Sequence, residues 1–152
     1  YLFLNKSMEK INGKNQLYSI IIYGEPVAQG RARSRVVNTR GGNSFVSHYD
    51  PKKSRNYKEF IQHQILIQGK PDKLIDEPIA MSCTFHRLRP KSKPKKVIWP
   101  TTKPDLDNYL KSVKDALNGL VIRDDSIVVG YKDIWKVYTL DSPRVEIILY
   151  GL

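Results

Sequence analysis

Cysteine is almost absent from this chain, since Cys83 is the only one among 152 residues. A single cysteine excludes a disulfide within the chain and fits a reducing compartment, and we expect Cys83 to pack as a small apolar residue. Long apolar runs are also absent, because no stretch reaches the roughly 18 residues that a membrane-spanning helix needs. The opening YLFLNKS has few apolar residues and no basic region before them, so it does not resemble a secretory signal. We therefore expect a cytoplasmic protein with no membrane partner.

Several common cofactor patterns are missing as well. The three histidines, His48, His63 and His86, do not have metal-ligand spacing, and one cysteine adds too little for a zinc site. The segment GEPVAQGRARS contains two glycines but lacks the G-K-[ST] ending of a phosphate-binding loop. We therefore expect no small-molecule cofactor, and we interpret the histidines as surface or hydrogen-bonded residues.

Acidic residues are scarce in the first two thirds of the chain. Residues 1–100 hold 19 Lys and Arg against 7 Asp and Glu, whereas residues 101–152 hold 7 against 8. The formal net charge is +11. A basic body beside a locally acidic segment predicts a polyanionic partner and a separate carboxylate site. Charge alone fits a basic protein with an ordinary C-terminal third equally well.

The pattern of apolar residues predicts one α+β domain over residues 17–152. Hydrophobic residues make up 40% of the chain and charged residues 27%, which is typical of a globular protein. Runs of β-branched and aromatic residues predict strands within residues 17–26, 78–88, 126–140 and 143–152. Helical spacing predicts two main helices within residues 50–69 and 105–119. We expect the helices to pack on a mixed sheet.

The remaining segments are predicted from their turn residues and prolines. Asp50 is the expected N-cap and Pro51 the first residue of the earlier helix. Residues 27–49 contain Gly41-Gly42 and predict a hairpin or a long loop, and residues 87–104 contain four prolines and predict a loop or extended arm. We expect residues 1–16 to be an N-terminal arm that is either disordered or foreign to the native chain.

The acidic segment KPDLDNYLKSVKDALNG places Asp105 at the start of the later helix and Asp107 one turn before Lys111. An apolar face is expected at Leu106, Tyr109, Leu110, Val113, Ala116, Leu117 and Leu120. Asp124 and Asp125 follow in IRDDS. A 15-residue helix is about 22 Å long. These two carboxylates therefore reach Asp105 only if the next segment turns back along the helix.

Two interpretations of these carboxylates remain open on spacing alone. Three carboxylates converging beside a lysine are typical of a Mg²⁺ site that hydrolyses phosphodiesters, with the lysine stabilising charge on the phosphate. Alternatively, Asp105 caps the helix, Asp107 pairs with Lys111, and Asp124-Asp125 form a turn.

The basic segments supply candidate phosphate contacts. Arg31, Arg33 and Arg35 alternate, so an extended strand places them on one face. A second group lies in the proline-containing loop, at Lys91, Lys93, Lys95 and Lys96. Together they favour DNA binding, although any single one fits a solvated surface role. Trp99 is either a stacking residue for an exposed base or an anchor in a core or interface.

Over most of its length, roughly residues 17–149, the chain resembles the RusA family of Holliday-junction resolvases, small endonucleases common in prophages. The resemblance rests on YGEPVAQGRAR, YDPKKSRNYKEF, RPKS, KPDLDNYLKSVKDALNG and RDDSIV. It implies an α+β fold, a homodimer and Mg²⁺-dependent cleavage of four-way DNA junctions by paired symmetric nicks, in DNA recombination and repair. It also implies that Asp105, Asp107 and Asp125 bind the metal and, with Lys111, form the catalytic set. Asp124 is then the supporting acid beside the ligands.

Three alternatives to an active resolvase make different demands on the sequence. A basic nucleic-acid-binding module uses these carboxylates only for caps and pairs, and binds DNA without nuclease activity. A catalytically inactive prophage resolvase would likewise bind DNA without cleaving it. A restriction-type nuclease needs an Asp/Glu-x-Lys motif after Pro104-Asp105, and none follows. The sequence therefore disfavours the restriction-type nuclease.

Overall fold

The computed structural model describes residues 15–30, 33–49 and 52–152, and for Arg33, His48 and Tyr49 only the backbone. The N-terminal arm expected for residues 1–16 falls almost entirely outside this range, as do Arg31, Asp50 and Pro51. The predictions made for those residues stay predictions.

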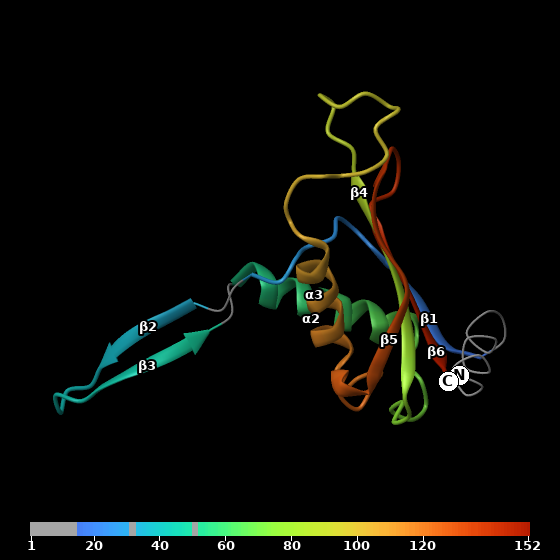
Figure 1. Cartoon of the computed structure of the whole chain (residues 1–152). Helices are drawn as coiled ribbons and strands as arrows, with labels where there is room; N and C mark the ends of the chain where they lie inside the picture. Colours follow the sequence, from blue (N-terminus) through green and yellow to red (C-terminus); the bar gives the residue numbers. More distant parts are fainter. Residues whose placement is uncertain (1–14, 31–32, 50–51) are drawn as a thin grey trace, which may run out of the picture.

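The main sheet has four strands in the order β1-β6-β4-β5 (Figure 1). They are β1 (Gln16–Tyr23), β4 (Ile79–Leu88), β5 (Val128–Thr139) and β6 (Arg144–Gly151). β6 pairs antiparallel with β1 and β4, whereas β4 and β5 are parallel. A parallel pair needs a crossover connection, and helix α3 (Leu106–Leu117) provides it. Helix α2 (Lys52–Gln68) lies beside α3. The predicted α+β fold with a mixed sheet and two helices is confirmed for the described residues.

The core forms where both helices cover one face of the sheet. Every second residue of β6 is buried, at Val145, Ile147 and Leu149, as expected for a strand with one covered face. Phe85 of β4 stacks on Tyr109 of α3 with ring centroids 5.1 Å apart. Cys83 is buried as predicted, and this burial raises the pKa of its thiol.

Helix α3 buries the apolar face that its sequence predicts, with one addition. Tyr109, Leu110, Val113, Ala116 and Leu117 are buried, and so is Ser112, which the helical pattern did not place there. Its hydroxyl donates to the Tyr109 carbonyl at 2.7 Å, which satisfies the polar group inside the core.

Helix α2 uses two glutamines to cover the outer edge of β1. Gln64 exchanges hydrogen bonds with the backbone N–H and C=O of Tyr23, at 3.2 and 3.0 Å. Gln68 donates to the Ile21 carbonyl at 2.8 Å. An edge strand exposes unpaired backbone groups, and these side chains satisfy several of them.

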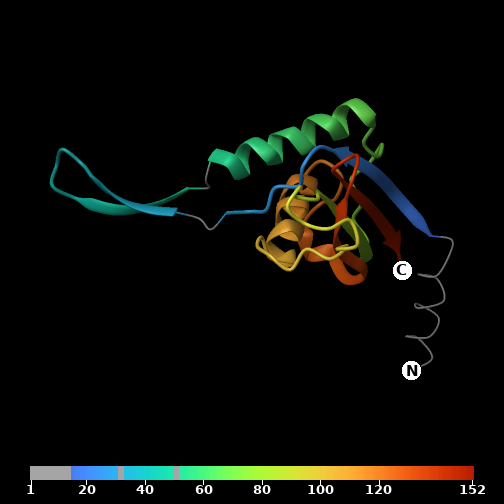
Figure 2. The same cartoon turned by 90° about the horizontal axis from the view of Figure 1, so that it is seen from above.

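Residues 27–49 contain the hairpin that the sequence offered as one of two possibilities. β2 (Arg33–Asn38) and β3 (Ser44–Tyr49) form a separate two-stranded sheet, with Gly42 at φ +81° in the turn. The hairpin extends away from the sheet and helices in both views (Figure 1, Figure 2). Val36, Phe45 and Val46 are exposed on it.

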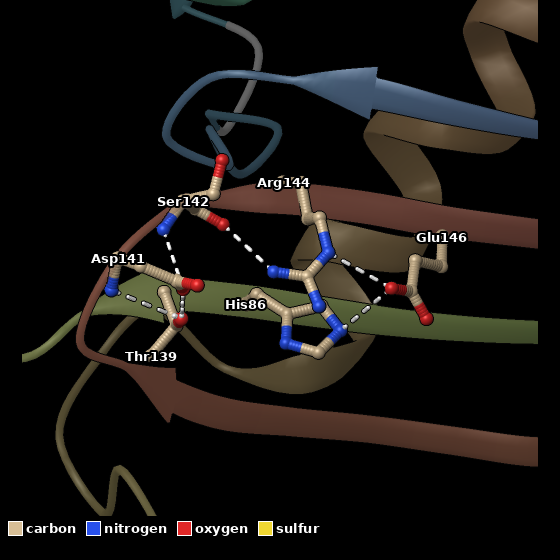
Figure 3. Close-up of polar contacts among 6 residues, drawn as sticks. All are labelled: His86, Thr139, Asp141, Ser142, Arg144 and Glu146. Atoms are coloured by element: carbon tan, nitrogen blue, oxygen red, sulfur yellow. Dashed lines mark hydrogen bonds and ion pairs between the residues drawn. The ribbon is translucent and has the colours of Figure 1, made fainter.

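A polar cluster surrounds the turn between β5 and β6 (Figure 3). The Thr139 hydroxyl and then the Ser142 N–H donate to Asp141 and lower the pKa of its carboxyl. Arg144 Nε donates to Glu146 Oε1 at 2.8 Å, and His86 Nε2 lies 3.5 Å from the same oxygen. Partial burial opposes ionisation of Glu146, but Arg144 and His86 outweigh it and lower the pKa of this carboxyl.

Candidate active site

Three of the predicted site residues lie along the first two turns of α3. Asp105 occupies the N-cap position with extended backbone, but its carboxylate makes no capping hydrogen bond. Asp107 lies in the first turn and Lys111 one turn later, and all three side chains are exposed. Asp107 and Lys111 do not form an ion pair in this described helix. In this described helix Asp105 therefore does not cap through its side chain and Asp107 does not pair with Lys111, and both carboxylates are exposed to solvent.

Two cations hold the loop that leads into α3. Lys136 of β5 donates from Nζ to the carbonyls of Thr102 and Pro104, each at 3.1 Å. Arg87 of β4 donates to the same Thr102 carbonyl at 3.4 Å. The Lys103–Pro104 peptide bond is cis. The backbone immediately before Asp105 is thus fixed to the sheet.

No sequence motif predicts a role for either cation. Lys136 pairs with Phe85, whose side chain is in the core, so Lys136 lies at a helix-facing position of its strand. A lysine at an inward-facing strand position is unusual, and this was the one feature of the sequence that could have indicated a structural role for Lys136. The Arg87 guanidinium lies between the rings of Tyr109 and Tyr138, at 6.0 and 5.9 Å from their centroids. Burial raises the pKa of Tyr109, and the Arg87 charge opposes this rise.

The segment before the hairpin arm also contacts this end of α3. Gln29 N donates to the Asn108 carbonyl at 2.9 Å, and Gly30 N donates to the Ser54 hydroxyl of α2 at 2.8 Å. The base of the arginine-containing segment therefore lies beside the first turn of α3.

Asp124 and Asp125 follow the turn at the other end of α3. The Gly119 N–H donates to the Ile122 carbonyl at 2.8 Å in that turn, and the short helix η1 (Asp125–Ile127) contacts α3. The Asp124 carboxylate accepts the Ser126 N–H at 3.2 Å, and hydrogen bonding with Ser126 lowers the pKa of this carboxyl.

The direction of β5 separates the two groups of aspartates. Lys114 Nζ contacts the Tyr131 hydroxyl at 3.0 Å, and five residues further along β5 Lys136 contacts Pro104. β5 thus runs from the C-terminal end of α3 back to its N-terminal end. Asp125, which precedes β5, lies about one helix length, or roughly 18 Å, from the Asp105 end. In the described part of the chain, no three His, Cys, Asp or Glu residues form a group able to hold a metal.

The geometry therefore brings Asp105, Asp107 and Lys111 together but leaves Asp125 apart from them within one chain. Two exposed aspartates two residues apart suit a hard cation, because Mg²⁺ is bound by one or two carboxylates together with water and phosphate oxygens. The role of all four residues stays a prediction.

The predicted phosphate-contacting residues lie on the two extended segments. Lys91, Lys93, Lys95 and Lys96 are all exposed in the loop between β4 and α3. Arg35 is exposed on β2, and Arg33 occupies the alternate position on the same strand. Trp99 is not a core residue, because 55% of it is exposed.

The fold and this site define a small α+β protein in which an exposed acidic helix start follows a basic loop. Among the described helices, none is long and apolar enough to cross a membrane. Residues 23–150 match the family described as Endodeoxyribonuclease RusA. The chain therefore belongs to the RusA endodeoxyribonuclease family, whose members hydrolyse DNA.

Two relatives are similar to this chain over two thirds or more of its length. The uncharacterized protein YqaN of Bacillus subtilis (strain 168) is 42% identical over 138 residues, which cover 84% of this chain and 92% of that protein. The crossover junction endodeoxyribonuclease rusA of Lactococcus phage r1t is 33% identical over 104 residues, covering 67% of this chain and 76% of that protein.

Proposed function

We propose that this protein is a Mg²⁺-dependent, structure-selective endodeoxyribonuclease that resolves four-way DNA junctions by paired symmetric nicks, in DNA recombination and repair. Family membership supports the nuclease class, and the named activity of the phage relative supports a junction substrate. The observation that carries the proposal is the pair of exposed carboxylates, Asp105 and Asp107, at a helix start that Lys136 fixes to the sheet.

The proposed chemistry divides between the carboxylates and the lysine. Asp105 and Asp107 hold Mg²⁺, which when bound polarises the scissile phosphate and lowers the pKa of bound water. Lys111, one turn beyond Asp107, balances the negative charge that grows on the phosphate oxygens. The exposure of all three side chains leaves them accessible to a DNA backbone.

A homodimer is part of the proposal because one chain does not bring Asp125 to Asp105. In a two-fold dimer, Asp125 of the second copy completes each site, with Asp124 shaping the turn through its bond to Ser126. Two equivalent sites related by a two-fold axis also suit a substrate that is cut twice.

The basic segments are proposed to hold the arms of the junction. Arg31, Arg33 and Arg35 approach DNA along the hairpin, and Lys91, Lys93, Lys95 and Lys96 along the loop before α3. Phosphate neutralisation releases counterions, so junction binding should weaken steeply as salt concentration rises.

The test is cleavage of a synthetic four-way junction beside a linear duplex of the same sequence, with Mg²⁺ or with EDTA. Symmetric nicks in the junction alone, and only with Mg²⁺, are expected. Asp107→Asn should keep junction binding in EDTA and lose cutting. Tight binding by the wild-type protein without any cutting would instead identify a binding module or an inactive resolvase.

A further inference from the structure

The only two tryptophans of the chain pack against each other on the surface. The ring centroids of Trp99 and Trp135 are 5.7 Å apart and the rings are tilted by 38°. Trp99 is 55% exposed and Trp135 52%, and the neighbouring Ile98 is 53% exposed. Two large aromatic rings held together in water form an open apolar surface.

This tryptophan pair is fixed in place by the backbone around it. The Ile98 carbonyl accepts the Tyr138 N–H at 2.8 Å, which attaches the loop to the edge of β5, and Pro100 is buried. Trp135 belongs to β5 itself, next to Lys136, which holds the Thr102 and Pro104 carbonyls. The same strand therefore positions the tryptophan pair and the approach to Asp105.

The charge around the pair favours an anionic partner. Residues 78–104 contain seven Lys and Arg and no Asp or Glu. Lys95 and Lys96, just before Ile98, are exposed. A second copy of the chain presenting the same surface would bring like charges together, whereas a nucleic acid supplies both negative charge and flat aromatic faces.

We propose that the tryptophan pair is a stacking site for a nucleobase whose face is exposed at the branch point of the DNA. In a continuous duplex both faces of every internal base are covered by neighbouring bases, so within the DNA only an interrupted stack offers a free face. Stacking tolerates any base, so the site selects for DNA structure rather than sequence. The inference rests on the proposed binding of branched DNA and not on cleavage.

Intrinsic tryptophan fluorescence reports on this site alone, because the chain has no other tryptophan. The wild-type protein is titrated in EDTA with a four-way junction, a single strand and a fully paired duplex, while anisotropy of a label on the DNA reports binding independently. The junction and the single strand should quench the tryptophans much more than the duplex, whose only free base faces lie at its ends. Trp99→Ala should weaken junction binding about tenfold, and Trp99→Phe should restore most of it.

Tyr23→Ala is the matched control, since Tyr23 is 53% exposed on β1, the opposite edge strand of the sheet. It should bind the junction like the wild type. The inference fails if the junction binds by anisotropy while tryptophan fluorescence is unchanged, or if Trp99→Ala binds as tightly as wild type. It also fails if the tryptophan fluorescence of the protein without DNA changes with protein concentration and Trp99→Ala dissociates a dimer. The tryptophan pair would then form an interface between two copies of the chain. If the wild type binds no junction at all, the proposed function itself is wrong.

Discussion

At the scale of single residues, Lys136 shows how a half-buried charged side chain can support a neighbouring site. It faces the helices from β5, and its ammonium group is bound by the carbonyls of Thr102 and Pro104. Hydrogen bonds from a charged donor stabilise a fold even at a partly exposed position, so the lysine both stabilises the loop and sets the position of the residue that follows it, Asp105.

We expect Lys136→Met to slow junction cleavage at least tenfold while changing junction binding in EDTA much less. The loss of two hydrogen bonds should also lower the free energy of unfolding by about 1–3 kcal/mol. Single-turnover cleavage, binding and urea unfolding measure the three effects. Lys73→Met, at an exposed lysine outside this loop, is the control. Cleavage at the wild-type rate by Lys136→Met would show that the loop needs no such anchor.

A second residue, Glu146, makes a prediction about pH. Its folded pKa is lowered from the ordinary 4.5, so folding favours the ionised form. This contribution is complete above the ordinary value and is lost as the pH falls through the lowered pKa. We expect the wild type to lose stability below about pH 4.5 and Glu146→Gln to lose less over the same interval. Asp124 and Asp141 also have lowered pKa values, so the difference between the two proteins isolates Glu146. Parallel curves of unfolding midpoint against pH would contradict the assignment.

At the scale of elements, the periodicity of apolar residues predicted the position of each helix and which face of it is buried. Helix α3 was expected within residues 105–119 and spans Leu106–Leu117, with its apolar face buried. β5 was expected to begin at residue 126, but η1 occupies Asp125–Ile127 and the strand starts at Val128. The register of its pairing with β4 also shifts along the strand. The start and the register of a strand depend on hydrogen bonds to a segment far away in the sequence, so the local pattern does not determine them. The anchors of the loop before Asp105 come from two separate strands, so no local pattern reveals them.

The two faces of α3 should respond to mutation in opposite ways. Leu117 is fully buried, and Leu117→Ala should lower the free energy of unfolding by about 2–5 kcal/mol. Lys111 is exposed on the other face, so Lys111→Ala should change it by less than about 0.5 kcal/mol. In the proposed mechanism Lys111→Ala nevertheless loses cleavage. Urea unfolding and junction cleavage, measured on both variants, separate the structural face from the functional one. A Lys111→Ala protein that cuts normally would remove Lys111 from the site.

At the scale of the whole molecule, sheet topology decides which aspartates are neighbours. The sequence correctly placed Asp105 and Asp107 at the start of the helix, because residues two positions apart lie close together in any structure. It allowed Asp125 to join them if the chain turned back along α3. The chain does turn back, but it does so as β5, which begins only after Asp125. The third carboxylate is therefore left at the far end of the helix.

Mixing two inactive variants tests whether two copies share each site. If Asp105 and Asp107 of one copy work with Asp125 of the other, a heterodimer of Asp107→Asn and Asp125→Asn contains one intact site and one doubly altered site. Random exchange of subunits then restores about a quarter of the wild-type number of sites, and the recovered activity should be single nicks rather than paired cuts. If each site lies within one chain, every site in the mixture carries one substitution and no activity returns. Mixing Asp107→Asn with Asp105→Asn is the control, because those two residues lie at the same end of α3 and neither arrangement yields an intact site.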